Sequence, residues 1–194
     1  MDWRVTRSEA RRVVIEGDAW RRERMPIYRK RPPLTEREIE DGLAVASARH
    51  AFWRDRQTPR PIDEAMAGAS PGQVILYCVH YFDAEVRNGG FHQYFMNSTG
   101  DAALITLEAL NRLGEDERAG LLIAAMARFP GGIAPRRQSE RQAALSAIAY
   151  REDWRPWLQP IETTYYALDG DVLQRRIQEY VELHPEEFFV DADE

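Results

Sequence analysis

The residues best able to do chemistry lie in one stretch, "EVRNGGFHQYFMNSTGD", which runs from Glu85 to Asp101. Within it, Glu85, His92 and Asn97 offer a carboxylate, an imidazole and an amide, which an enzyme or a small-ligand site could use. The stretch also has a structural interpretation, because its paired glycines are typical of a helix end and a chain reversal. The residue types favour the structural interpretation, and the enzyme or ligand site is kept as the alternative.

The structural interpretation gives each unusual residue of this corner a role. Asparagine and glycine accept the left-handed backbone conformation that ends a helix. We expect the aromatic side chains to be buried beneath the bend, Gln93 and Asn97 to bridge unpaired backbone groups, and Ser98 to cap the next helix. We expect Glu85 and His92 to form a hydrogen bond across the bend. The predicted corner consists of Asn88, Gly89, Gly90, Phe91, His92, Gln93, Tyr94, Phe95, Asn97 and Ser98.

The residues that could bind a metal follow no recognised ligand spacing. The chain has four histidines and one cysteine, and it contains neither a His-Glu-x-x-His nor a Cys-x-x-Cys sequence. A centre made of His80, Glu85 and His92 would require the bend to fold His92 back toward the preceding helix. We therefore expect no metal.

Nucleophilic and phosphate-binding patterns are equally weak. Cys78 has apolar neighbours in "VILYCV", and apolar burial raises the pKa of a thiol and leaves it unreactive. Ser98 lacks the strand–turn–helix glycine elbow of a nucleophilic serine. The sequence "RNGG" follows a predicted helix instead of a strand, and no Gly-x-x-x-x-Gly-Lys sequence is present. We expect no cofactor, and the chain is predicted not to be an enzyme.

The elements that must position the corner are predicted to be helices. Ser70, Pro71 and Gln73 provide an N-cap, a proline at the first helical position and a glutamine at the third. The apolar run that follows predicts a buried central helix leading to the corner. No hairpin signal appears, so we predict an all-α fold: a single helical bundle-like domain of seven or eight helices with an N-terminal helical extension. The helix after the corner is expected to bury Leu104, Leu107 and Leu110.

Charge is unevenly distributed along the 194 residues. Residues 1–60 carry 15 Lys and Arg against 10 Asp and Glu, whereas residues 161–194 carry 2 against 10. The proline-containing sequences "PIYRKRPP" and "TPRP" interrupt the basic part. We therefore expect a basic N-terminal extension over residues 1–60 and a main helical domain over residues 61–194. An alternative function is that the basic arm contacts nucleic acid, although the net charge of −6 makes direct nucleic-acid binding by the chain as a whole unexpected.

The apolar runs are too short for a membrane segment. The longest, "VILYCV", has six residues, against the roughly 20 that a spanning helix needs. The first residues lack the apolar stretch of a signal peptide, and a single cysteine cannot form an internal disulfide. We expect a cytoplasmic protein that has no membrane partner.

The sequence "NGGFHQYFMNSTGD" resembles the signature of the DNA mimic protein 19 family of small bacterial proteins. The resemblance extends over roughly residues 62–190 and includes "ALITLEALNRLG", "ARFPGG" and "IETTYYALDGDVLQRRIQEYVELHPEEFF". It implies a helical fold that is often dimeric. For the namesake of the family, it implies an acidic surface that imitates the phosphates of duplex DNA and occupies the DNA-binding face of a transcription factor.

The resemblance implies a function for the acidic end of the chain. Carboxylates spaced like phosphates would attract a basic cleft and make the encounter sensitive to salt. We therefore expect a non-enzymatic protein-interaction module whose partner is a transcription factor or other DNA-binding protein, and we expect a homodimer. The predicted partner-binding surface consists of Glu162, Asp169, Asp171, Glu179, Glu182, Glu186 and Glu187.

Overall fold

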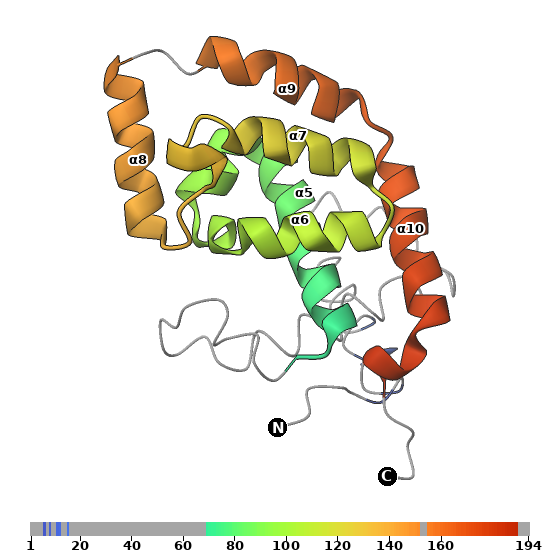
Figure 1. Ribbon diagram of the computed structural model, residues 1–194. Helices are drawn as coiled ribbons and strands as arrows, with labels where there is room; N and C mark the ends of the chain where they lie inside the picture. Colours follow the sequence, from blue (N-terminus) through green and yellow to red (C-terminus); the bar gives the residue numbers. More distant parts are fainter. Residues whose placement is uncertain are drawn as a thin grey trace. The chain divides into compact units, whose positions relative to one another are not determined.

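The computed structural model describes residues 69–151 and 155–189, together with the single residues 6, 8, 11, 12 and 15. All the regular elements of residues 69–188 are helices (Figure 1), so the all-α prediction is confirmed. The predicted number of seven or eight helices is higher than the six α-helices of the described residues. One reason is that "FHQYF" continues the central helix beyond a kink instead of forming a helix of its own. Apart from these five single residues, the predicted extension lies outside the described residues, as does the boundary between residues 60 and 61.

The described chain falls into two compact units, one made of residues 69–77 and 178–189 and the other of residues 78–177. None of the described helices combines the length and the apolar character that crossing a membrane would require. Short 3-10 helices cover Ser98–Ala102, Pro130–Gly132 and Pro185–Glu187. The α-helices are α5 (Pro71–Met96), α6 (Ala103–Arg112), α7 (Asp116–Met126), α8 (Gln138–Arg151), α9 (Arg155–Ala167) and α10 (Gly170–Leu183).

The start of α5 is fixed by a reciprocal capping box. The backbone N–H of Gln73 donates to Ser70 Oγ, and the backbone N–H of Ser70 donates to Gln73 Oε1, each at 3.1 Å. Two amides that a helix start would leave unpaired are satisfied in this way. The Ser70 hydroxyl also donates to the carbonyl of Glu187. Gly72 leaves room for Phe188, because an added Cβ would lie 2.6 Å from its ring.

Most of the largest fully buried side chains in the core of residues 78–177 are aromatic. Phe82 contacts Tyr94 and Tyr165 edge to face, with ring centroids 5.0 and 5.5 Å apart. Phe95 contacts Phe129 in the same way at 5.1 Å. These rings are almost completely buried, and edge-to-face pairs add to the stabilisation that burial alone provides. The aromatic residues of the corner therefore belong to the main core of this unit.

Helix α6 presents a different face to the core from the one predicted. Leu110 is buried as expected, but Leu104 is 43% exposed and Leu107 is only half-buried. The inward side instead carries small residues together with Thr106, whose hydroxyl lies 3.0 Å from the Tyr94 hydroxyl. Because this hydrogen bond joins two buried polar groups, turning Thr106 outward would leave Tyr94 unpaired. Leu104 therefore lies on the outer side of the helix.

We predict that stability falls steeply in alkaline solution. Burial raises the pKa of Cys78 to about 12, and it raises the pKa of Tyr94 and of Tyr165 well above the usual tyrosine range. In the unfolded chain a thiol ionises near pH 8.5 and a phenol near pH 10, so the unfolded state loses protons first as the pH rises. The free energy of unfolding should therefore stay constant up to about pH 8 and then fall, by up to about 1.4 kcal/mol per pH unit for each group.

Urea denaturation from about pH 7 to about pH 10.5 measures this effect. Lys30 is the only lysine of the chain, and six tyrosines besides Tyr94 and Tyr165 also titrate near pH 10. These side chains alter the slope only to the extent that folding changes their pKa. The variant Cys78→Ala should show a shallower decline between about pH 8.5 and about pH 10, since its unfolded state no longer gains from thiolate formation. A free energy of unfolding that stays constant throughout would contradict the burial of these three groups.

Candidate functional site

The corner is a kink between two helical parts of α5. Gly89 has φ −154° and ψ 25°, and Gly90 has φ 73° and ψ −177°, so neither residue is helical. The positive φ of Gly90 lies in the region that glycine enters without steric cost. A Cβ added to Gly90 would also overlap the carboxylate of Glu162. Both the backbone conformation and the close approach of Glu162 therefore require glycine at this position.

Helix α9 caps the helix where it restarts after the kink. The backbone N–H of Phe91 donates to Glu162 Oε1 at 2.9 Å, which satisfies one of the amides that a helix start leaves unpaired. One turn later on α9, the Tyr166 hydroxyl donates to the carbonyl of Val86 at 3.0 Å. The resemblance implied a partner-binding role for Glu162, but here its half-buried carboxylate makes an internal cap. Helix α9 thus contacts α5 on both sides of the kink.

Arg141 of α8 caps the C-terminal end of α5. Its side chain is completely buried, and Nε and Nη2 donate to the carbonyls of Phe95 and Asn97, both at 2.7 Å. These carbonyls lie at a helix C-terminus, where intrahelical donors are missing and a positive charge is favourable. Nη1 lies 2.8 Å from Asp101 Oδ1. A Cβ on Gly100 would lie 2.8 Å from Arg141 Nε, so that glycine makes room for the guanidinium.

Two glutamines of α8 complete this cap. The side-chain amides of Gln138 and Gln142 both donate to the carbonyl of Met96 at 2.9 Å. Together with Arg141 they follow the i, i+3, i+4 spacing that places three side chains on one face of a helix. That spacing was the only sequence signal for this cap, and it did not reveal which carbonyls the face would meet.

Glu85 is the centre of a polar cluster inside the bend. Its Oε2 accepts from the side-chain amides of Gln93 at 2.6 Å and Asn97 at 2.8 Å. Its Oε1 lies 3.4 Å from the Thr99 hydroxyl. The structure therefore brings Glu85 and Asn97 together, but the amides of Gln93 and Asn97 donate to a carboxylate and not to backbone groups. His92 is exposed.

The cluster around Glu85 is arranged to hold the bend. A general base needs a lone pair directed at a substrate proton, whereas both oxygens of Glu85 already face donors of the chain. The Asn88 amide donates to Gln93 Oε1 at 3.0 Å, so the Gln93 side chain is bonded at both its nitrogen and its oxygen. The 3-10 helix that follows has Asn97 as its N-cap without a side-chain cap hydrogen bond, and Ser98 is its first residue.

Two arginines hold the turn between α9 and α10. Arg87 Nη2 donates to the carbonyl of Leu168 at 3.2 Å, and Arg118 Nη2 donates to the carbonyl of Asp169 at 2.9 Å. Both guanidinium groups lie over the ring of Tyr165, each 5.9 Å from its centroid. The carbonyls at the end of α9 are therefore paired with positive charge, which also opposes the negative end of the helix dipole. The hydrogen bonds from Arg87 and Arg118 to this turn fix the direction in which α10 begins.

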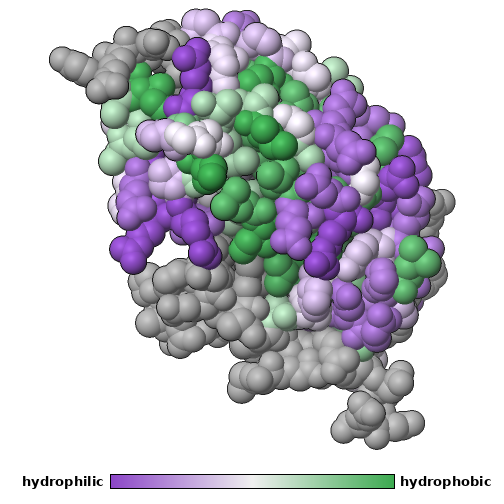
Figure 2. Space-filling model, in the orientation of Figure 1, coloured by the Kyte–Doolittle hydropathy of each residue, from purple (hydrophilic) through white to green (hydrophobic). Residues whose placement is uncertain are grey.

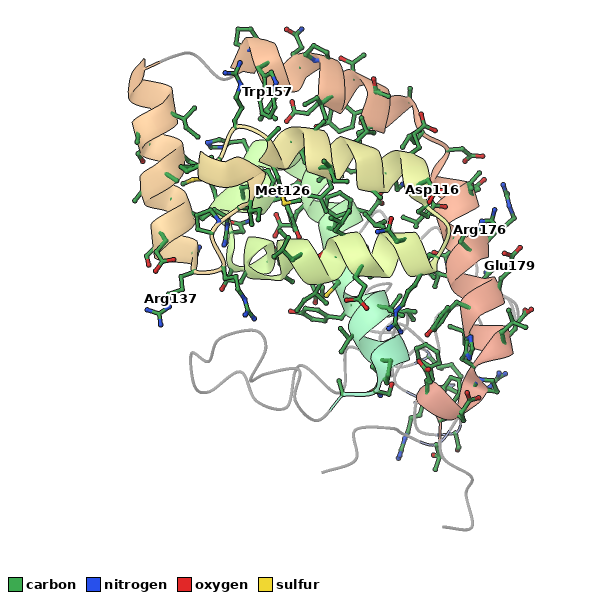
Figure 3. The ribbon with its side chains drawn as sticks, viewed as in Figure 1. Asp116, Met126, Arg137, Trp157, Arg176 and Glu179 are labelled. Carbon is green, nitrogen blue, oxygen red and sulfur yellow. The ribbon has the colours of Figure 1, made fainter. Side chains whose placement is uncertain are left out.

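The acidic residues expected to bind a partner differ in their surroundings. Asp169 Oδ1 accepts from the backbone N–H of Asp171 at 2.8 Å and begins α10. Glu187 is half-buried, and its Oε2 accepts from the Tyr180 hydroxyl at 3.1 Å. Figure 3 shows Glu179 pointing away from α10. The exposed members of the predicted surface are Asp169, Asp171, Glu179, Glu182 and Glu186.

One group in the described part of the chain has the composition of a metal site. His184, Glu186 and Glu187 offer ligand atoms that all lie within 4.8 Å of one another. His184 Nδ1 is 3.7 Å from Glu186 Oε1. These side chains are exposed or half-buried, and exposed acidic groups of this kind are common without a metal. The group differs from the combination of His80, Glu85 and His92 considered from the sequence.

A family model described as DMP19-like protein matches residues 67–184. The chain belongs to the DMP19-like protein family. The matched range contains the kink, both of its caps and all of α10, so the resemblance read from "NGGFHQYFMNSTGD" is confirmed. No match was found among the curated proteins or among the solved structures. The family match establishes the family of this chain. Its function has to be argued from the residues of its own surfaces, because proteins that share a fold can differ in function.

We predict that Gly90→Ala is more destabilising than Gly114→Ala. Gly114 has φ 69°, close to that of Gly90, but a Cβ there would meet nothing within 4 Å. The Gly114 variant should therefore lose only the conformational term, about 1 kcal/mol. Gly90→Ala should lose clearly more in urea denaturation, since its Cβ also displaces the Glu162 carboxylate. Adding Glu162→Ala should cost less in the Gly90→Ala background than alone, and equal costs in both backgrounds would contradict the overlap.

We predict that Arg141→Met lowers the free energy of unfolding by about 3–5 kcal/mol, because it leaves buried carbonyls without their donor and the Asp101 carboxylate without its ion-pair partner. Arg112→Met is the matched control, since Arg112 forms an exposed pair with Glu108 at 3.1 Å that should contribute less than about 1 kcal/mol. Arg141→Lys should restore only part of the loss, because one ammonium cannot reach the carbonyls that the planar fork spans. Similar losses for the two Met variants in urea denaturation would argue against the cap.

Proposed function

We propose that this protein is a non-enzymatic interaction module that binds a transcription factor or other DNA-binding protein through an acidic surface. The surface that we propose, called the acidic C-terminal surface below, consists of Glu179, Glu182, Glu186 and Glu187. The observation that carries the proposal is that three of these four carboxylates are exposed, whereas the polar groups of the corner form hydrogen bonds within the chain. Charge available to a partner is therefore concentrated near the end of the described chain.

The acidic C-terminal surface is compared with DNA by the sign and the density of its charge. Residues 161–194 contain 10 acidic residues and 2 basic ones, so this part of the chain has a negative field that attracts a basic cleft. Duplex DNA carries one negative charge per about 1.7 Å of its axis. Glu179 and Glu182 are separated by three residues, or about 4.5 Å of helix rise. We therefore propose that the surface imitates only part of a phosphate track, enough for a few ion pairs with arginine or lysine.

Two arginines that precede this surface in the sequence limit how closely it can imitate DNA. Arg175 and Arg176 both lie on α10 and are exposed, and Arg176 precedes Glu179 by three positions. A uniform phosphate track has no positive charges of this kind. They would repel some basic surfaces and admit others, and such combined attraction and repulsion is how interfaces gain specificity.

Membership of the DMP19-like family supports a role in macromolecular interaction. The alternative of an enzyme or ligand site at Glu85, His92 and Asn97 receives less support, since Glu85 and Asn97 are bonded to each other. The other alternative, a basic arm that contacts nucleic acid, concerns residues 1–60, which lie almost entirely outside the described part of the chain.

The proposal predicts that a partner is lost when charge is removed from this surface but not from elsewhere. Immobilised wild-type protein and the variant Glu179→Gln/Glu182→Gln would be exposed to an extract of the source cell. The control Glu108→Gln/Glu140→Gln removes two exposed charges from other helices. Wild type and control should retain a basic DNA-binding protein that elutes as salt rises and that duplex DNA displaces, whereas the variant should bind it at least about 10-fold more weakly.

Purified wild type, variant and control would then be compared by titration with the captured partner at several salt concentrations. The logarithm of the affinity should fall less steeply with the logarithm of the salt concentration for the variant, because fewer ion pairs form. Equal binding by variant and wild type would reject the acidic C-terminal surface. Binding that is indifferent to both salt and duplex DNA would reject mimicry.

A further inference from the structure

Part of the N-terminal end of the chain lies in the same compact unit as the acidic C-terminal surface. The residues described near the start of the chain are Thr6, Ser8, Arg11, Arg12 and Ile15. All of them group with residues 178–189 and not with residues 78–177. The last four are helical, and they stand at i, i+3, i+4 and i+7, positions that share one side of a helix. A helical segment with two arginines therefore belongs to the unit that contains the acidic C-terminal surface.

The two ends of this unit carry opposite charge. Residues 4–15 contain four arginines and one glutamate, whereas residues 178–189 contain four glutamates and neither lysine nor arginine. Figure 2 shows mainly hydrophilic residues on the side of the molecule where Figure 1 places α10. A negative surface attracts a basic segment of any origin, and the chain supplies one of its own.

The spacing of the charges also agrees between the two segments. Three arginines of the basic segment are separated by three and then four positions: Arg4, Arg7 and Arg11. Three glutamates of the acidic C-terminal surface have the same separations: Glu179, Glu182 and Glu186. Opposite charges at matching separations can pair one to one, and such complementarity fixes the register of a contact.

Charged residues of both segments already have neighbours within the chain. Arg11, Glu179 and Glu186 each interact with another residue of the chain, and Glu186 does so in addition to its contact with His184. Both glutamates are nevertheless exposed. Exposed ion pairs are weak and are screened by salt. A contact between the two segments is therefore one that a more strongly basic partner can displace.

A weak contact is still populated when both of its halves belong to one chain. A tether keeps the local concentration of a segment at about the millimolar level, so a contact too weak to join separate molecules can form within one molecule. We infer that residues 4–15 bind the acidic C-terminal surface of the same chain and compete there with the basic partner. The apparent affinity for that partner is then reduced to the fraction of molecules whose surface is open. The competition rests on the proposed function, whereas the contact itself does not.

Zero-length cross-linking of the full chain tests the contact without any partner. A carbodiimide joins an amine to a carboxylate only where the two groups meet, and Lys30 is the only lysine of the chain, so an introduced lysine is read against little background. In Arg11→Lys, the new amine should become linked to the acidic C-terminal surface, as mass spectrometry of the digested protein identifies. Arg112→Lys is the control, because Arg112 pairs with Glu108 and its replacement should be linked there instead.

A mixture of chains with natural and heavy nitrogen shows whether the two linked groups belong to one chain. Links that form within one chain contain a single isotope, whereas links between chains also combine the two. Links of a single isotope in Arg11→Lys support the inference. Links that combine both isotopes in statistical proportion, links to other carboxylates only, or no links at all would overturn it.

Competition is measured by titration with a fluorescent peptide of about nine arginines as the basic probe. The test variant replaces the three arginines of the basic segment, Arg4→Gln/Arg7→Gln/Arg11→Gln. The control replaces three exposed arginines elsewhere, Arg112→Gln/Arg136→Gln/Arg137→Gln. Both variants lose the same charge, so a general increase in attraction is equal in the two. The test variant should bind the probe at least about 5-fold more tightly than the control, because its acidic C-terminal surface is open.

The results separate this inference from the proposed function. Circular dichroism spectra and melting temperatures establish that each variant is folded. Equal affinity of the test variant and the control for the probe would overturn the competition. Single-isotope links support the contact even where no basic partner is found, and only the proposed function then fails. A partner that binds the acidic C-terminal surface, with no links and no gain in the test variant, overturns the inference alone.

Discussion

The hydrogen bonds of Arg141 join the C-terminal end of α5 to the segment just before α8, and the rest of the structure depends on this junction. One buried guanidinium donates to carbonyls of Phe95 and Asn97 at the end of α5 and to the carbonyl of Pro135 just before α8. A buried cation is costly unless charge and hydrogen bonds compensate for lost hydration. Here the Asp101 carboxylate and several carbonyls provide that compensation, so the C-terminal end of α5 is held to the first turn of α8 and to the segment just before it.

The short helix that contains the family signature is stabilised by its neighbours. Six residues after the kink form too few hydrogen bonds to be helical alone. Glu162 satisfies the first amide of this helix, and Arg141, Gln138 and Gln142 satisfy its last carbonyls. Groups that resembled an active site in the sequence are thus the groups that a kinked helix needs.

Local signals in the sequence predicted the local features well. Ser70 and Gln73 formed the expected capping box, and the paired glycines interrupted the helix where expected. What could not be predicted depends on residues far apart in the chain. Nothing near Glu162 shows that its carboxylate meets an amide 71 residues earlier, and the rotation of α6 follows from the Tyr94–Thr106 hydrogen bond. The buried position of Arg141 was missed for the same reason, because an arginine in a polar helix is usually solvated.

Phe91 and Glu162 are 71 residues apart in the chain, so the hydrogen bond between them can form only late in synthesis. A ribosome that has made residues 71–96 has not yet made the carboxylate that caps the second half of that helix. Contacts between distant residues form slowly because the intervening chain must first be ordered. The signature segment therefore completes its structure only after α9 has emerged. We expect its aromatic side chains to be accessible to chaperones and to neighbouring nascent chains until then.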